Sequence, residues 1–221
     1  MKTILTLKYG TKYSSEDVNR IYNSIESGYN HVCITDNPVG LNANIKTIPL
    51  PKNLDGHWYK LWMYSLDNLG DIIYLDLDVR IQKNVSELFN FVDIVPTICY
   101  TYWKDDEFPN LDPGKHSMRF LSNYNSSVVL WKSGTTKGIW ELFESNLDYY
   151  MVKYYGDDRF LWHENLNFNV FPKGLIYSFT FGADILDRTK FLIRRSYIIA
   201  LLNGSDLFPN AANKYDELFM H

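Results

Sequence analysis

The chain has 221 residues, 46% hydrophobic and 22% charged, which predicts one globular domain over residues 1–221 with a core of its own. The formal net charge of −4 gives no overall basic field, so we expect no nucleic acid partner. No apolar run approaches the roughly 18 residues of a membrane span, so the sequence predicts no transmembrane segment.

The first part of the chain predicts a strand–helix–strand unit. Residues 3–8 indicate a strand, and Ser14 is a typical helix N-cap with Asp17 as its capping-box partner. The apolar residues behind it recur with helical spacing: Val18, Ile21, Tyr22 and Ile25. His31–Thr35 indicates the second strand, so we expect a parallel sheet covered by helices. Neither G-x-G-x-x-G nor a Walker lysine loop is present, which argues against dinucleotide-binding and P-loop proteins.

The remaining elements continue this alternation. A helix is expected over about Tyr59–Leu69, followed by Ile72–Leu75, a short apolar strand of the kind that is covered on both faces. Further along we expect a long irregular loop at Trp103–Arg119, a strand at Ser126–Trp131, a helix marked by Ile139, Trp140, Phe143 and Leu147, and a last strand at Tyr197–Leu202. The fold class is therefore α/β, with a Rossmann-like mixed, mainly parallel sheet flanked by helices.

Cysteine usage and the start of the chain bear on the compartment. Cys33 and Cys99 lie in apolar runs and are expected to be small buried residues rather than a disulfide pair. The lack of a disulfide framework favours a reducing compartment. The apolar stretch at the start is too short for a signal peptide and ends at Lys8. These features predict a cytoplasmic protein.

A pair of carboxylates, Asp76 and Asp78, follows the buried strand directly. Ligands of open α/β sheets gather beyond the carboxyl ends of the strands. In extended backbone the two carboxylates project to one side and Leu77 to the other. Two like charges beside a hydrophobic strand repel each other and are costly to desolvate, and a divalent cation removes both penalties. With phosphate oxygens and water, they form the oxygen shell that Mg²⁺ or Mn²⁺ prefers.

Two other interpretations of this pair stay open on the residues alone. The first is a polar strand end with two solvated aspartates, which is the usual meaning of an isolated D-x-D. The second is an aspartate-nucleophile phosphatase. Phosphatases of that class have Thr or Val two residues after the second Asp and usually carry the motif on the first strand. Here the position holds Arg80, and the motif begins after some seventy residues, so the phosphatase fits less well.

Six segments in a fixed order carry a family resemblance: residues 6–13 with 18–22, 32–36, 58–61, 74–79, 124–128 and 156–158. The chain resembles the GT-A glycosyltransferases, nearest to small bacterial and viral members of the glycogenin and lipopolysaccharide-galactosyltransferase group. Tyr-Leu-Asp-Leu-Asp at 74–78 is the most specific piece. The resemblance implies a single GT-A domain over 1–221 and, for a viral member, a location in the host cytoplasm.

On the donor nucleotide, the resemblance implies a UDP-sugar whose diphosphate is bound through Mn²⁺ or Mg²⁺. The implied metal ligands are Asp76, Asp78 and Asn203, and the implied nucleotide-binding residues are Thr6, Lys8, Tyr13, Lys60, Asp76 and Leu77. Tyr13 is equally consistent with a packed core tyrosine, and Lys60 with a solvated helix lysine.

On the donor sugar, the resemblance implies binding by Asn125, Ser126 and Asp157, and catalytic roles for Asp157 and Asp158. Asn125 is also consistent with an ordinary residue at the start of a strand. The family commonly has Gln at the position of Asp158, so the family's sugar preference does not carry over to this chain.

A second departure lies near the end of the chain. The family has a metal-binding His where this chain has Asn203, and a later Lys for which residues 205–209 offer no equivalent. An amide oxygen is a competent ligand for Mg²⁺ or Mn²⁺, although weaker than imidazole for softer metals. Basic residues that could meet the diphosphate instead are Lys190, Arg194, Arg195 and Lys214.

The function that these features predict is a hexosyltransferase-like enzyme. It moves a sugar from the nucleotide-sugar to an unidentified glycan, lipid or protein acceptor, and the resemblance implies retention of the anomeric configuration. The acceptor walls are expected at 103–119 and after Asp184. The alternative is a non-catalytic nucleotide-sugar or carbohydrate-binding relative, which the residues at 158 and 203 favour. A glycosidase fits less well, because it leaves Lys8, Tyr13 and Lys60 without a role.

Overall fold

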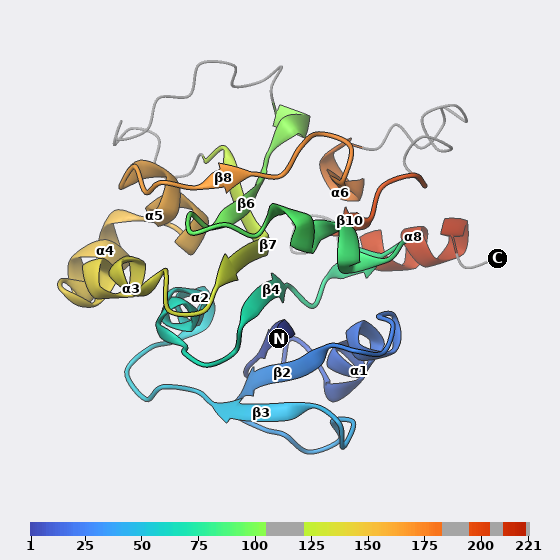
Figure 1. Ribbon diagram of the computed structural model, residues 1–221, viewed down its shortest axis with the longest axis horizontal. Helices are drawn as coiled ribbons and strands as arrows, with labels where there is room; N and C mark the ends of the chain where they lie inside the picture. The colour runs from blue at the N-terminus through green and yellow to red at the C-terminus, as the bar shows by residue number, and fades with distance from the viewer. Residues whose placement is uncertain (105–121, 183–194, 204–209, 220–221) are drawn as a thin grey trace.

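A seven-stranded mixed sheet with strand order β3-β2-β1-β4-β7-β6-β8 forms the centre of the fold (Figure 1). The computed structural model describes residues 1–104, 122–182, 195–203 and 210–219. The strands are β1 Lys2–Lys8, β2 Asn30–Thr35, β3 Lys46–Pro49, β4 Asp71–Leu75, β6 Thr97–Tyr100, β7 Tyr124–Lys132 and β8 Asn169–Val170. β7 is antiparallel to both of its neighbours, and the other pairs are parallel.

A second, three-stranded sheet has the order β5-β10-β9 and consists of β5 Val79–Ile81, β10 Ile199–Leu201 and β9 Ile176–Ser178. β10 is antiparallel to β5 and parallel to β9. Because β5 begins one residue after Asp78, the two aspartates occupy the junction where the chain leaves the large sheet and enters the small one.

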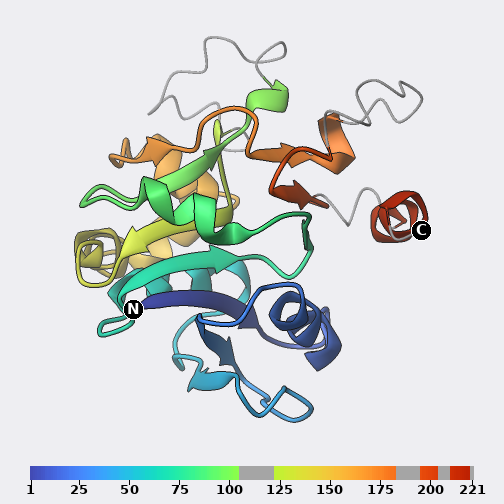
Figure 2. The ribbon, with the colours of Figure 1, turned by 45° about the vertical axis from the view of Figure 1, so that its right-hand side comes forward.

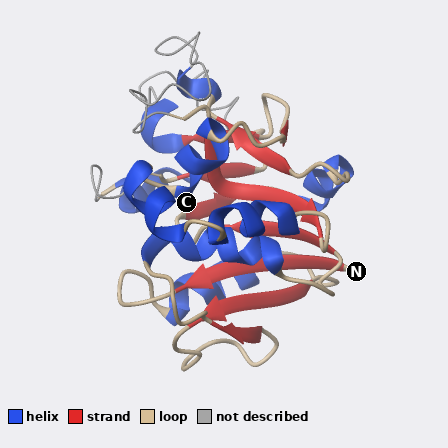
Figure 3. Cartoon of the chain, turned by 90° about the vertical axis from the view of Figure 1, so that its left-hand side faces the viewer, coloured by secondary structure: helices blue, strands red, loops and turns tan. Residues whose placement is uncertain are grey.

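Helices cover both faces of the large sheet, as Figures 2 and 3 show. One face packs against α1 Ser15–Asn23 and the 3-10 helix η3 Val85–Phe91. The other packs against η1 Gly56–Trp58, α2 Tyr59–Trp62, η2 Met63–Ser65, α3 Lys137–Glu144, α4 Leu147–Lys153 and α5 Asp157–His163. The other helices among the described residues are η4 Tyr102–Lys104, α6 Phe179–Gly182 and α8 Ala211–Phe219, of which α6 and α8 pack with the small sheet.

The central strand β4 is buried on both faces, as its apolar run predicts. Ile72 and Tyr74 belong to the core on the α2–α5 face, whereas Ile73 and Leu75 belong to the core on the α1 face. This alternation is the period-2 geometry of a strand. It fixes the direction in which the chain leaves the sheet at Asp76.

The predicted opening unit is confirmed. Ser14 caps α1, and its side chain and the Asp17 carboxylate form the complete capping box. Both Cys33 and Cys99 are buried and form no disulfide, as expected. In the described part of the chain, no helix is long and apolar enough to cross a membrane.

The predicted helix over Tyr59–Leu69 is too long. The helical segment ends at Ser65, and Leu66 is extended with a ψ of 133°. Hydrogen bonds to Ser133 replace the helical ones: its hydroxyl donates to the Leu66 carbonyl at 3.1 Å and accepts from the Leu69 N–H at 3.3 Å. These long-range bonds turn the chain back toward β4, a tertiary effect that helical periodicity does not show.

Two other element boundaries differ from expectation. The apolar spacing from Ile139 to Leu147 predicts one helix, but α3 ends at Glu144 and α4 begins at Leu147. The Ser145-Asn146 pair between them is short and polar, and such residues favour helix ends over helix interiors. The last strand is shorter than Tyr197–Leu202, because only Ile199–Leu201 pair with β5 and β9. Most of the loop expected at 103–119 lies outside the described residues.

Candidate functional site

The site lies where the carboxyl ends of β1 and β4 meet the start of the antiparallel strand β7. The Asp76 N–H extends the ladder of β4 by donating to the Ser127 carbonyl at 2.9 Å. Asp76 therefore lies beside Ser126, although fifty residues separate them in sequence. This is the edge at which open α/β sheets bind ligands.

Lys60, from the short helix α2, is bound to the Asp76 carboxylate. Its Nζ lies 2.7 Å from Oδ1 and 2.8 Å from Oδ2 of Asp76, and donates to the Ser126 hydroxyl at 3.3 Å. The Tyr74 hydroxyl also donates to Asp76 Oδ1, at 2.6 Å. The two charged side chains are only 13% and 20% exposed. Burial lowers the pKa of Lys60, but the Asp76 and Asp157 carboxylates outweigh burial and raise it, so Lys60 is charged.

The backbone of the aspartate pair is a turn and not the extended segment that the i, i+2 argument assumes. Leu77 and Asp78 form the turn, and the Val79 N–H donates to the Asp76 carbonyl at 3.4 Å. The cause is the change of sheet at this point, since the chain must turn between β4 and β5. The Leu77 side chain packs in the core. A contact between Leu77 and a nucleotide would therefore have to come from its backbone.

Asp78 carries an acceptor atom without a donor. Its Oδ1 is buried and has no hydrogen-bond partner among the residues that the structure describes. Burial, and then repulsion from Asp76, raise the pKa of Asp78 to about 6, although Lys60 and Lys12 oppose the shift. A buried carboxylate oxygen without a partner is costly, so the position favours a cation ligand.

Asn203 comes directly after a residue that is hydrogen-bonded to the backbone of Asp78. The preceding residue, Leu202, donates its N–H to the Asp78 carbonyl at 3.2 Å. The Asn203 Oδ1 accepts a hydrogen bond from the Ser178 hydroxyl at 2.8 Å, which orients the amide and occupies one lone pair. Within the described ranges, no group of three or more His, Cys, Asp or Glu residues has the arrangement of a metal site. Any divalent ion here would depend on two carboxylates, this amide, and oxygens from the ligand and water.

Asp157 and Asp158 open helix α5, and their environments differ. Asp157 is 5% exposed, and its Oδ2 is buried without a hydrogen-bond partner in the described part of the chain. Burial raises its pKa, while Lys60 opposes the shift. Asp158 forms an ion pair through Oδ1 with the guanidinium of Arg159. The structure therefore brings Asp157 into the electrostatic field of Lys60 and gives Asp158 a cation of its own.

The predicted nucleotide-binding residues of β1 are mostly engaged within the protein. The Thr6 hydroxyl is buried and donates to the Val32 carbonyl at 3.4 Å. Lys8 is also buried and donates to the Asn37 carbonyl at 3.3 Å. Tyr13, which precedes the α1 cap, is half-buried against the core on that face, with the Lys12 ammonium 5.5 Å from its ring centre.

The predicted sugar-binding residues begin β7 beside Asp76. Ser126 is buried and accepts from Lys60, whereas Asn125 is partly exposed and accepts from the Ser127 N–H at 3.1 Å through Oδ1. Of the basic residues suggested for the diphosphate, Lys190 and Arg194 lie outside the described residues. Arg195 donates to the Phe219 carbonyl at 3.1 Å, and Lys214 belongs to α8.

Two residues near the site, Tyr9 and His57, were not predicted from the sequence. Tyr9 follows β1 directly; burial chiefly raises its pKa, and Lys60, Asp76 and Asp157 all act on it, so it lies among the charged groups of the site. His57 acts electrostatically on Asp157, and its Nε2 is buried with no hydrogen-bond partner among the described residues. Their positions in the sequence could have indicated them. Tyr9 follows the end of a strand, and His57 precedes Lys60 by three residues.

Comparison with known proteins gives no match at the level of sequence: no family model and no curated protein matches the chain. Solved structures do match. The galactosyltransferase LgtC, solved in complex with donor and acceptor sugar analogues, aligns with a TM-score of 0.61 at 13% identity, over 98% of this chain and 94% of that one. This chain has a GT-A-type glycosyltransferase fold.

Two further glycosyltransferases show the same architecture. The glycosyltransferase GlyE of Streptococcus pneumoniae TIGR4 aligns with a TM-score of 0.62 at 10% identity, over 96% of this chain and 61% of that one. Mouse xyloside xylosyltransferase 1 aligns with a TM-score of 0.54 at 14% identity, over 93% and 99%. The fold predicted from the resemblance is confirmed, and at these identities the likeness concerns the fold.

Proposed function

We propose that the protein transfers a sugar from a nucleotide-diphosphate sugar, a UDP-sugar, to a glycan, lipid or protein acceptor, with retention and with the aid of Mn²⁺ or Mg²⁺. The observation that carries this proposal is the buried Asp78 Oδ1, which has no donor among the residues that the structure describes. It lies near the Lys60–Asp76 pair, at the ligand-binding edge of a glycosyltransferase fold. A bound cation would give Asp78 Oδ1 a partner, and a diphosphate would supply further oxygen ligands for that cation.

The residues that would hold the metal are Asp76, Asp78 and Asn203. All three offer oxygen atoms, which suit Mg²⁺ and Mn²⁺ and disfavour softer metals. The ion would act as a Lewis acid for the negative charge that develops on the leaving diphosphate.

Lys60 would stabilise the same negative charge through its ammonium group. Its ammonium is already desolvated and held by Asp76 and Ser126, so little reorganisation is needed when a phosphate oxygen arrives. The leaving diphosphate then needs no acid to protonate it.

Asp157 would face the donor sugar. As the sugar–phosphate bond breaks, positive charge develops at the anomeric carbon, and a buried carboxylate nearby stabilises that charge. Asn125 and Ser126 would orient the sugar hydroxyls. Asp158 is tied to Arg159, so in this proposal it shapes the sugar pocket through the pair rather than as an isolated charge.

A second candidate is a binding protein without turnover. Two observations favour it: the Asn203 oxygen is already engaged by Ser178, and the Asp158 charge is neutralised by Arg159. Both features weaken the family's catalytic pattern while leaving a ligand site in place.

Nucleotide release from a panel of UDP- and GDP-sugars, with and without Mn²⁺, separates the two candidates. We expect metal-dependent release that Asp78→Asn abolishes. The matched control is Asp67→Asn, which makes the same change at an exposed ion pair with Lys137 and should leave release unchanged. Metal-dependent nucleotide binding without release from any sugar supports the binding protein. Release of phosphate from an aryl phosphate would contradict both candidates and indicate a phosphatase.

A further inference from the structure

The turn that carries the two aspartates is held through its three carbonyl groups. The Asp76 carbonyl accepts from the Val79 N–H at 3.4 Å, and the Asp78 carbonyl accepts from the Leu202 N–H at 3.2 Å. The Leu77 carbonyl accepts from Nη2 of Arg20, a side chain 57 residues away in sequence. The first of these bonds is long and therefore weak, so the turn depends on the other two.

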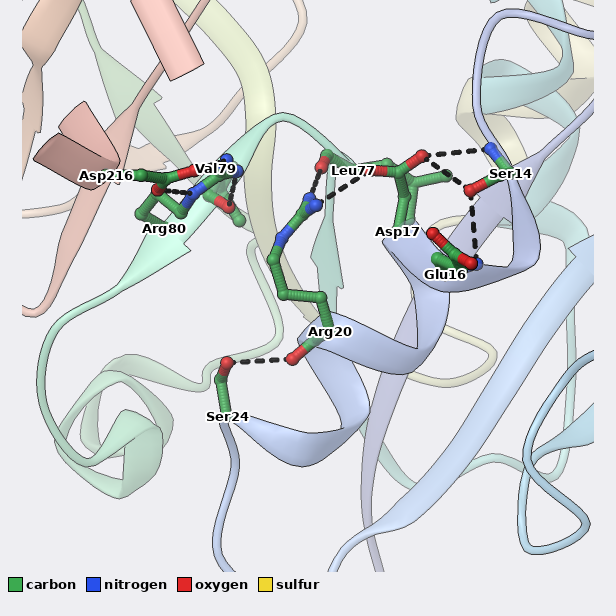
Figure 4. A network of polar contacts seen from close by, with 9 residues as sticks. All are labelled: Ser14, Glu16, Asp17, Arg20, Ser24, Leu77, Val79, Arg80 and Asp216. Atoms are coloured by element: carbon green, nitrogen blue, oxygen red, sulfur yellow. Dashed lines mark hydrogen bonds and ion pairs between the residues drawn. The ribbon is translucent and has the colours of Figure 1, made fainter. Parts of the chain in front are cut away.

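Arg20 connects this turn to the start of helix α1 (Figure 4). Its Nη1 lies 2.7 Å from Asp17 Oδ1. The other oxygen of Asp17 accepts from the Ser14 N–H at 2.9 Å and from the Ser14 hydroxyl at 3.2 Å. Ser14 directly follows Tyr13, at the end of the loop that leaves β1. One chain of hydrogen bonds therefore runs from that loop to the aspartate turn.

The guanidinium group is suited to this role. It is planar, permanently charged and presents donors in a rigid fork. One arm binds a carboxylate on α1 and the other binds the Leu77 carbonyl, so the position of the peptide is fixed relative to the helix. The Leu77 carbonyl belongs to the peptide that joins Leu77 to Asp78, so a displacement of this carbonyl also displaces the backbone that carries the Asp78 side chain.

We propose that Arg20 is a positioning residue that holds the Leu77 peptide and so sets the direction of the Asp78 carboxylate before a ligand binds. This inference rests on the proposed function, since the direction of Asp78 matters only if that carboxylate binds a metal. Residues that orient metal ligands typically change metal affinity 10- to 100-fold when they are replaced.

The surroundings of Arg20 predict that replacing it disturbs only the nearby turn. A cavity of about 460 Å³ lies against the turn, lined among others by Arg20, Ser24, Val79, Arg80 and Tyr215. When the guanidinium is removed, this cavity gives water access to the Leu77 carbonyl. The carbonyl then keeps a hydrogen-bond partner, and the turn loses its fixed orientation instead of the domain losing its fold.

The test compares Arg20→Gln with the control Asp17→Asn. The control substitution removes the charge of the capping box, but its amide oxygen still offers an acceptor to Arg20, so the bond to Leu77 remains. Hydrogen exchange of the Val79 amide reports the order of the turn in the absence of ligand. The Mn²⁺ concentration for half-maximal UDP binding reports the orientation of the carboxylates.

For Arg20→Gln we expect Val79 exchange to rise about tenfold and the half-maximal Mn²⁺ concentration to rise about tenfold, while UDP binding at saturating Mn²⁺ changes less than about threefold. Asp17→Asn should lower thermal stability yet leave both readouts within about threefold. Unchanged Val79 exchange in Arg20→Gln, or equal effects of the two variants, would overturn the inference. If the wild-type protein shows no Mn²⁺-dependent UDP binding, the proposed function fails, and Val79 exchange alone decides whether Arg20 holds the turn.

Discussion

Replacing Asp78 with Asn should stabilise the ligand-free protein at neutral pH while it removes one ligand of the proposed metal site. The pKa of Asp78 is raised to about 6 from an ordinary value of 3.8, chiefly by burial. A shift of roughly two units corresponds to about 3 kcal/mol by linkage, at 1.36 kcal/mol per unit. Because Asp78 is partly exposed, water screens part of this cost, and we expect a gain of about 1–2 kcal/mol. For a domain of this size that is a rise in Tm of roughly 2–8 °C.

The sign of the pH dependence follows from the direction of the shift. The folded state holds the Asp78 proton to higher pH than the unfolded state, so folding stability falls as pH rises from about 4 to about 6. The advantage of Asp78→Asn should therefore be small at pH 4 and complete above pH 6.5. Thermal unfolding in EDTA across this range measures it, with Asp67→Asn as a control whose Tm difference from the wild type should stay constant. A variant that is less stable than the wild type at pH 7, or an advantage that does not change with pH, would show that the buried charge of Asp78 does not destabilise the folded state.

Three further predictions concern the site and the fold. Lys60→Gln leaves the Asp76 and Asp157 carboxylates without their cation and should lower the free energy of unfolding, measured in urea, by about 3 kcal/mol. The control Lys137→Gln, at an exposed ion pair, should have no measurable effect. A loss below about 1 kcal/mol for Lys60→Gln would contradict a stabilising role of the Lys60–Asp76 pair. Asp157→Asn should lower the rate of sugar transfer about 100-fold or more while UDP affinity changes little; equal losses in both would mean that Asp157 only supports binding. Ser133→Ala removes two hydrogen bonds to the segment before β4 and should cost about 1–2 kcal/mol; an unchanged urea midpoint would show that this link does not hold the segment.

Much of the sheet could be predicted because local patterns and tertiary structure agree there. The four apolar residues of Ile72–Leu75 indicate a strand covered on both faces, and the structure buries them between two helical layers. The Ser14–Asp17 capping box depends on residues three apart, so it is visible in the sequence and forms as expected.

The predictions were less accurate where distant residues decide the local structure. The early end of the helix at Ser65 depends on hydrogen bonds to Ser133, and the turn at Leu77 depends on the passage between two sheets. No local pattern carries either fact. The aspartates could be found by their position after a buried strand, whereas the contact between Arg20 and Leu77 requires the folded chain.

The candidate site was predicted as a set of residue types rather than as a geometry. The pairing of Lys60 with Asp76 and the engagement of Asn203 by Ser178 both become visible only when separate elements meet. The position after a buried strand and the resemblance supplied the proposed roles of Asp76, Asp78 and Asp157, and the buried Asp78 Oδ1 is the structural observation that supports the metal proposal.

We propose above all that a divalent cation joins Asp76 and Asp78 to the diphosphate of a nucleotide. The most direct measurement is anomalous scattering from crystals of the protein soaked with Mn²⁺ and UDP. We predict a manganese peak in contact with Asp78 Oδ1, with diphosphate oxygens completing the shell near Lys60. A crystal in which UDP is bound at this edge without manganese beside either aspartate would contradict it.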